Sequence, residues 1–326
     1  LFRPHPPRPG RPAGMSAPPS AVPRFAHEAM TTLFEIFIPG PDEIYAGQAA
    51  REAFREIDRL EARFNRFDPG SEISRINRLL PGEETTVGIE TFECLALAEA
   101  VRLETGGAFD ANARAAALDA FAEGRDAKPE PAPFELLGGA GSCLVRRLEE
   151  ERPGHGPIDL DLGGIGKGYA LDRAGQLLLT WGVPDALLHG GTSTVLALGS
   201  PAAASGTEPS RESSERTGWP VGIGAGWPGA PERVFLSGRA LSGSGTEVKG
   251  GHILDPRTGR PARGNLAAWA SAPTAALSDA LSTAFFVMTA DGVEACAARN
   301  PEIGACLVVA YGDVRIFNPR FFPAGG

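Results

Sequence analysis

The chain has 326 residues, a net charge of −9 and an apolar fraction of 42%, which supplies a sizeable core and allows one or two domains. The acidic balance and the lack of any Lys and Arg cluster argue against a nucleic-acid-binding surface. The chain holds no run of about 18 apolar residues, so the sequence predicts no transmembrane segment.

The cysteines and the N-terminal composition indicate the cellular compartment in which the protein is expected. The four cysteines, at positions 94, 143, 296 and 306, form no CxxC pair and have no histidines at metal-binding spacing. The first 24 residues lack the continuous apolar core of a signal peptide. We therefore expect buried thiols and a cytoplasmic setting. The chain begins with Leu1 rather than Met, which leaves open an upstream export or lipoprotein signal, or a start at Met15.

The N-terminal half predicts mainly helices. Residues 1–24 are rich in proline and arginine and predict a disordered arm, followed by a domain over 25–323. Weak alternation predicts a strand over 33–38, and helical spacing of apolar residues predicts a helix from Asp42 to Phe64. Further expected elements are a short helix capped by Ser71, a helix over 90–104, a Pro/Gly-rich connection over 124–142 and a strand over 143–148.

The C-terminal half predicts mainly strands. An apolar strand at 158–162 is expected to lead through a glycine-dense turn into a helix over 169–181, and residues 201–218 predict a disordered insertion because they are almost free of apolar residues. Two more helices are expected at 275–289 and 292–298. Strands are expected at 186–189, 194–198, 219–223, 233–236, 240–242, 266–272, 306–310 and 314–317. Because no repeat and no linker divides these elements, we predict one mixed α+β domain.

The glycine-dense turn is the first candidate for a ligand site. Glycines 163, 164, 166 and 168 remove the Cβ atoms that would keep a ligand off the backbone, and amides at a helix start attract phosphate or pyrophosphate. A P-loop would need Gly at Asp161 and Ser or Thr at Gly168, and the dinucleotide fingerprint breaks at Tyr169. The residues alone leave open an anion site near Lys167 or an ordinary tight turn.

Asp279 and Thr283 form the second candidate, because they lie four residues apart on a helix that is otherwise mostly apolar. A buried carboxylate must be paired or bind a cation, and a carboxylate with a hydroxyl suits Mg²⁺. The alternative is an Asp stabilised by the helix dipole and a Thr bonded to the backbone. His252, before a Pro/Gly turn, is either catalytic or structural, and Asp110 either binds a hydroxyl group or caps the next segment.

Six segments, in order and at matching intervals, carry a family resemblance. They are residues 28–32, 64–77, 105–110, 161–172, 252–259 and 278–283. Together they resemble the ApbE family, the FAD:protein FMN transferases. The resemblance covers nearly the whole chain from His27 to Phe317 and implies an ApbE-like α+β domain.

The resemblance also implies an activity and site residues. The activity is Mg²⁺-dependent transfer of FMN from FAD to a Thr or Ser hydroxyl of a target flavoprotein, with release of AMP. By match, Asp279 and Thr283 bind the metal together with a backbone carbonyl of the glycine turn, near Gly164 or Gly166. The residues that match cofactor contacts are Met30, Phe67, Ser71, Asn77, Asp110, Lys167 and His252. Three of these are catalytic candidates, because Lys167 would stabilise developing charge and His252 or Asp110 would take the acceptor proton.

The sequence departs from the family pattern at three places. Thr31 stands where the family usually has Gly, Thr192 where it has Asp or Asn, and Ala111-Asn112 where it commonly has Pro-Thr. The metal pair is intact. An FAD pyrophosphatase and a non-catalytic flavin-binding protein remain the alternative hypotheses, and the second of these would require a damaged metal site.

Overall fold

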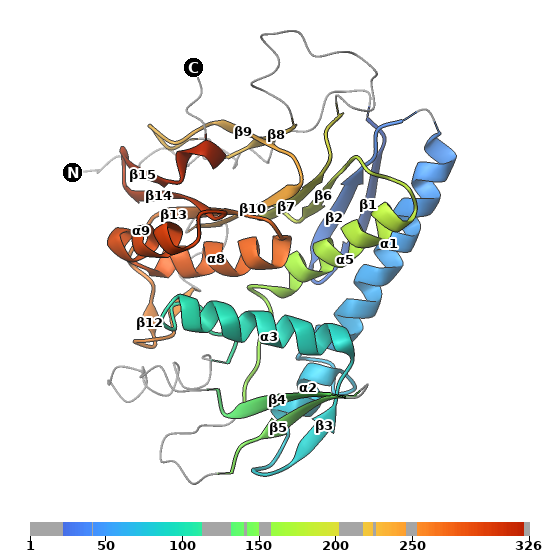
Figure 1. The fold of residues 1–326 in the computed structure, drawn as a ribbon, viewed down its shortest axis with the longest axis vertical. Coiled ribbons are helices and arrows are strands. Elements are labelled where there is room, and N and C mark those ends of the chain that lie inside the picture. The colour runs from blue at the N-terminus through green and yellow to red at the C-terminus, as the bar shows by residue number, and fades with distance from the viewer. Residues whose placement is uncertain are drawn as a thin grey trace, which may run out of the picture.

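A computed structural model describes residues 22–40, 42–112, 132–139, 142–149, 158–201, 218–223, 226–245 and 253–322. Within these ranges the largest unit is an eight-stranded sheet in which all neighbouring strands are antiparallel (Figure 1). Its order is β1 (Arg24–Ala29), β2 (Thr32–Phe37), β6 (Ala186–Gly190), β7 (Thr194–Leu198), β10 (Arg239–Gly245), β13 (Ala267–Ala272), β14 (Gly304–Ala310) and β15 (Asp313–Phe317). The predicted α+β class is confirmed, and the strands predicted at 186–189 and 194–198 and at 306–310 and 314–317 are present and form two hairpins.

A layer of helices covers one face of this sheet (Figure 1). It comprises α1 (Glu43–Phe64), α5 (Gly166–Thr180) and α8 (Ala275–Val287), while α9 (Ala290–Arg299) packs on β14 and β15. Helix α1 begins where the Asp42 side chain accepts a 2.9 Å bond from the Tyr45 amide, so its predicted start is confirmed. Helix α8 is buried over almost its whole length, because it lies between the sheet and two other helices, α5 and α3 (Ile89–Glu104).

The opposite face of the sheet is covered by the hairpin of β8 (Trp219–Gly222) and β9 (Arg233–Leu236). Trp219 is fully buried there, and its indole N–H donates to the Leu198 carbonyl over 2.9 Å. Strands β6 and β7 are therefore buried on both faces, which explains why their sequences are continuously apolar.

A smaller unit lies on the far side of α3 (Figure 1). It contains α2 (Glu72–Asn77) and a sheet with the order β3 (Glu84–Thr86), β5 (Ser142–Arg147) and β4 (Phe134–Gly139). The sequence did not predict β3, and it placed β4 in an irregular connection. Two glycines at the end of β4 weaken the strand propensity of its sequence. Gly138 packs closely against α3, since a Cβ there would lie 3.1 Å from the Phe92 ring. Contacts with α3 thus override local preference.

Residues 158–162 do not form the predicted strand. The Asn77 side-chain amide pairs with both backbone groups of Leu160, at 2.8 and 3.1 Å, and the Asn112 side chain accepts from the Asp159 amide at 2.8 Å. Side chains thus take the place of a neighbouring strand. After this segment, α5 begins at Gly166, three residues before the predicted start.

Some predictions fall partly or wholly outside the described residues. Arg24 was assigned to the disordered arm but is the first residue of β1, paired with Phe37, so the arm boundary was placed too late. Residues 1–21, 202–217 and His252 lie outside the described ranges.

Among the helices inside the described ranges, none is long and apolar enough to cross a membrane. The two short strands β11 (Leu254–Asp255) and β12 (Arg260–Pro261) and a 3-10 helix (Pro319–Phe321) complete the fold.

The turn between β1 and β2 is strained. Met30 and Thr31 connect the paired residues Ala29 and Thr32 with φ angles of 49° and 59°, a left-handed region that a β-branched residue disfavours. We expect Thr31→Gly to raise the free energy of unfolding by about 1 kcal/mol, because Gly adopts this φ without steric conflict. Urea unfolding checks this. Thr85→Gly in β3 is the control and should lower the free energy of unfolding. A lower free energy of unfolding in Thr31→Gly would contradict the strain of the turn.

His189, in the middle of the sheet, predicts acid sensitivity. Burial lowers the pKa of His189 to about 4. The charge of Glu35 opposes this change, and the charge of Arg24 adds to it. The unfolded chain then binds more protons between pH 4 and 6.5, so stability is full above pH 6.5 and falls as the pH drops towards 4. The pKa difference corresponds to about 3 kcal/mol. We expect His189→Leu to flatten the unfolding free energy over this window, as measured by urea unfolding at a series of pH values.

Candidate active site

The first turns of α5 and α8 touch backbone to backbone, and this contact builds the site. A Cβ on Gly168 would lie 2.2 Å from the Ala275 carbonyl oxygen. One turn further along α5, the Asp172 carboxylate accepts bonds of 2.7 and 2.8 Å from the Ala275 and Ala276 amides and so caps α8. Burial raises the pKa of Asp172 to about 6, although these two bonds oppose the rise. This crossing brings Asp279 of α8 to the start of α5.

Asp279 is the centre of the site. It is only 4% exposed, and its Oδ2 accepts from the Lys167 ammonium at 3.1 Å and from the Gly168 amide at 3.3 Å. Its Oδ1 accepts from the Thr194 hydroxyl at 3.2 Å. The Lys167 ammonium also donates to the Gly163 carbonyl over 3.0 Å. A positive charge therefore sits between a carboxylate and a carbonyl of the glycine turn.

Thr283 and the glycine turn come together beside this carboxylate. The Thr283 hydroxyl donates to the Asp279 carbonyl at 3.3 Å, as the structural alternative expected, but its oxygen keeps acceptor capacity. Gly164 packs against it, since a Cβ at 164 would lie 3.5 Å from Thr283 Oγ1 and 3.2 Å from the Phe109 ring. The absence of a side chain at 164 thus allows the turn to approach α8.

This donor set fits a hard divalent cation. The Lys167 ammonium stands in for a cation between the Asp279 carboxylate and the Gly163 carbonyl. The Thr283 hydroxyl lies next to Gly164 in the same turn, so all three donors are oxygen atoms. The carbonyl that contacts this ammonium belongs to Gly163, the neighbour of the predicted Gly164. In the described ranges no group of three or more His, Cys, Asp or Glu side chains could hold a metal. A cation here would share its charge with ligand phosphates, as Mg²⁺ commonly does.

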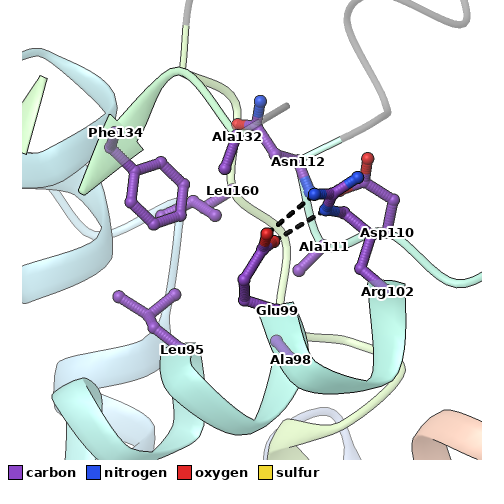
Figure 2. Close-up of a pocket in the computed structure, with 10 residues that line it drawn as sticks. All are labelled: Leu95, Ala98, Glu99, Arg102, Asp110, Ala111, Asn112, Ala132, Phe134 and Leu160. Carbon is purple, nitrogen blue, oxygen red and sulfur yellow. Dashed lines mark hydrogen bonds and ion pairs between the residues drawn. The ribbon is translucent and has the colours of Figure 1, made fainter. Parts of the chain in front are cut away.

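Asp110 lies at the edge of a small pocket next to the segment that enters the glycine turn (Figure 2). Its carboxylate accepts from the Asn112 amide at 2.8 Å. Burial raises the pKa of Asp110, while the nearby Arg102 guanidinium lowers it and Glu99 raises it. Arg102 is itself held by Glu99 at 2.7 Å. The pocket residues are Leu95, Ala98, Glu99, Arg102, Asp110, Ala111, Asn112, Ala132, Phe134 and Leu160.

The residues predicted from the segment 64–77 have different surroundings. The Ser71 side chain caps α2 by accepting from the Ser74 amide at 3.0 Å, and the Asn77 amide is engaged with Leu160. Ser71 therefore stabilises the start of α2, and Asn77 at the end of α2 holds the segment that leads into the glycine turn. Phe67 is 82% exposed, so its ring is accessible to a planar ligand.

The turns at one end of the sheet connect Met30 to the site. Met30, partly buried against the core, lies in the β1–β2 turn. The neighbouring β6–β7 turn is tied to β2 by the Gly191 amide, which donates to Leu33 over 2.9 Å, and β7 then begins with Thr194 beside Asp279. His252 lies outside the described residues, so its position relative to the site stays a prediction.

Sequence reasoning missed two groups that the structure brings to Asp279. Thr194 lies in an apolar hairpin strand and carries no motif, and its role depends on strand pairing that brings it under α8. The Gly163 carbonyl is a backbone atom, so no residue type marks it. Only a three-dimensional arrangement could have identified either group.

Comparisons with known proteins identify the family of the chain. A model of the ApbE family matches residues 30–307. An FAD:protein FMN transferase of Rhodobacter capsulatus is 28% identical over 267 residues, which cover 78% of this chain and 49% of the relative. The chain thus spans about half the length of that curated relative.

Solved structures share the fold. The flavin transferase ApbE from Vibrio cholerae has a TM-score of 0.70 at 19% identity, covering 93% of this chain and 100% of that one. The Pseudomonas stutzeri flavinyl transferase ApbE, in its apo form, has a TM-score of 0.70 at 21% identity, covering 94% and 98%. The ApbE protein from Thermotoga maritima has a TM-score of 0.67 at 25% identity, covering 90% and 96%. The family match extends over well over half of the sequence, so the resemblance inferred from the motifs is confirmed and the chain belongs to the ApbE family.

Proposed function

We propose that this chain is a Mg²⁺-dependent FAD:protein FMN transferase, which moves FMN from FAD to a Thr or Ser hydroxyl of a target flavoprotein and releases AMP. Family membership and the transferase from Rhodobacter capsulatus support the reaction class. The observation that carries the proposal is the buried Asp279 carboxylate at the start of α5. It contacts the Lys167 ammonium, which in turn contacts the Gly163 carbonyl of the glycine turn. That arrangement suits a pyrophosphate held through a metal.

The reaction exchanges one phosphorus–oxygen bond for another. The acceptor hydroxyl oxygen bonds to the FMN phosphorus, the bond from that phosphorus to the AMP oxygen breaks, and AMP leaves with the electron pair. The hydroxyl proton passes to a base. Mg²⁺, held by Asp279, Thr283 and a turn carbonyl, would neutralise charge on the pyrophosphate. The N-terminus of α5 and the Lys167 ammonium would stabilise the remaining negative charge.

Asp110 and His252 are the two candidates for the base. Burial raises the pKa of Asp110, which brings a carboxylate closer to the pKa that base catalysis near neutral pH requires. We expect the variant of the true base, Asp110→Asn or His252→Gln, to lose the acidic limb of the pH–rate profile. If a variant keeps this limb, the residue that it replaces is not the base.

Covalent flavin fluorescence tests the proposal. The purified chain is incubated with FAD, Mg²⁺ and candidate flavoprotein subunits, and the products are separated on a denaturing gel. A fluorescent acceptor band that disappears with EDTA supports FMN transfer. Bound FAD without a labelled acceptor across several targets would contradict it. Equal release of FMN and AMP without any acceptor would instead indicate a pyrophosphatase, in which water replaces the hydroxyl.

A further inference from the structure

The two carboxylate oxygens of Asp279 have partners of different kinds. Oδ1 accepts from the Thr194 hydroxyl, a neutral donor on a strand, at 3.2 Å. Oδ2 accepts from the Lys167 ammonium at 3.1 Å and from the Gly168 amide at 3.3 Å, and the same ammonium lies 3.5 Å from Oδ1. The Thr194 hydroxyl thus joins the carboxylate to the sheet through Oδ1, while the shorter of the two ammonium contacts and the amide contact go to Oδ2.

Thr194 is a fixed partner. It is fully buried, and β7 pairs with β6 on one side and β10 on the other, so that Thr194 lies opposite Gly190 and Ser242. The two strand pairings fix the backbone from which its hydroxyl projects. Because Asp279 is itself buried in α8, this bond fixes the carboxylate orientation by joining a central strand to a buried helix.

Lys167 is an exchangeable partner. Its four-carbon stem carries the ammonium from the first turn of α5, and its side chain retains 13% exposure. The ammonium touches the Gly163 carbonyl and Asp279 Oδ2, which are oxygen atoms of the kind that a divalent cation would use. A divalent cation at these oxygens would repel the ammonium, so we expect metal binding to displace it.

We infer that Thr194 is the positioning residue of the cation site, holding Oδ1 while Oδ2 exchanges between the Lys167 ammonium and a divalent cation. The inference rests on the metal site of the proposed function but not on FMN transfer. In the metal-free protein Lys167 neutralises a carboxylate that burial would otherwise leave unpaired. Metal binding releases the ammonium, which is then free for the ligand phosphates.

The inference predicts opposite changes in one measured constant. Thr194→Val keeps the shape but removes the hydroxyl, so the dissociation constant for Mn²⁺ or Mg²⁺ should rise about 10-fold. Thr194→Ser restores the hydroxyl and should restore the affinity. Lys167→Met removes the competing ammonium, so metal should bind about 10-fold more tightly in the absence of FAD, even though transfer activity falls.

Thr91→Val is the matched control. Thr91 is also fully buried, and its hydroxyl also donates to a carboxylate, that of Glu72, at 2.5 Å. It lies on α3 rather than beside Asp279. A general loss of stability should therefore appear in both Thr→Val variants, whereas a loss of metal affinity should appear only at position 194. Thermal unfolding measured alongside separates the two effects.

Metal affinity is measured on the full chain without FAD or acceptor, by electron paramagnetic resonance of free Mn²⁺ and by calorimetry with MgCl₂. Weaker binding in Thr194→Val, recovery in Thr194→Ser and tighter binding in Lys167→Met support the inference. Unchanged affinity in Thr194→Val, weaker binding in Lys167→Met, or no binding to either wild type or Lys167→Met would overturn it. If Thr194→Val does not fold, the smaller Thr194→Ala replaces it. A chain that shows the predicted pattern but transfers no FMN refutes the proposed function alone.

Discussion

Asp279→Asn is expected to lower FMN transfer by about 10³-fold or more. The substitution keeps the shape of the side chain but removes the only carboxylate of the proposed donor set, and it leaves the Lys167 ammonium without its counter-ion. An amide oxygen binds Mg²⁺ far more weakly than a carboxylate, so charge on the pyrophosphate would stay unneutralised. Initial rates of flavin transfer at saturating FAD and a series of Mg²⁺ concentrations measure the effect.

Neighbouring residues on α8 separate a metal-site effect from a folding effect. Ser278 is also fully buried, but its hydroxyl donates to the Ala270 carbonyl at 2.8 Å and lies outside the donor set. Ser278→Ala should therefore lower stability and retain activity. Thr283→Ser should retain activity as well, whereas Thr283→Val should require more Mg²⁺. Full transfer by Asp279→Asn would show that Asp279 holds no metal that the reaction needs, and would eliminate the proposed metal site.

Gly168→Ala is expected to lower the free energy of unfolding by more than about 3 kcal/mol, or to prevent folding. The new Cβ would lie 2.2 Å from the Ala275 carbonyl oxygen and 2.7 Å from the Ala276 amide nitrogen, both backbone atoms that no side-chain rotation relieves. Helices α5 and α8 would have to separate. Their separation would move Asp279 away from the start of α5, so activity should fall as well. Chemical unfolding followed by circular dichroism gives the size of the loss.

Gly166→Ala is the matched control on the same helix. A Cβ at Gly166 would meet the Leu162 and Phe64 side chains at 3.5 Å, which is ordinary contact, and Ala favours helix by about 1 kcal/mol over Gly. We expect unchanged or slightly higher stability. Equal stability of the two Ala variants would mean that the helices do not cross at Gly168 as closely as described.

The sequence predicted those elements whose patterns are local. The amphipathic pattern predicted α1 within one residue, and the apolar strands β6 and β7 were found because both faces of the sheet are covered there. Strand β4 was missed because it ends in two glycines, of which Gly138 packs against α3. The expected strand at 158–162 was wrong because the Asn77 and Asn112 side chains take its backbone bonds. In both places a distant partner decides the local structure.

The candidate site shows the same division. The spacing of Asp279 and Thr283 and the glycine-dense turn identified two halves of the site, and the fold brings them together through the contact at Gly168. Thr194 and the Gly163 carbonyl could not be found, because their place depends on strand register and turn geometry. The present partners of Lys167 are Asp279 and Gly163, so its predicted role at the phosphates requires a change of partner that the sequence did not suggest.

Intact-mass spectrometry of an acceptor flavoprotein gives the most direct test of FMN transfer. The acceptor is incubated with FAD, Mg²⁺ and either wild-type chain or Asp279→Asn, and AMP is quantified in the same samples. With the wild type we expect one FMN moiety on the acceptor Thr or Ser of each acceptor protein, and an equal amount of AMP. With Asp279→Asn we expect neither product. Consumption of FAD to free FMN and AMP with an unmodified acceptor, or addition of FMN at the same rate by the variant, would contradict this account.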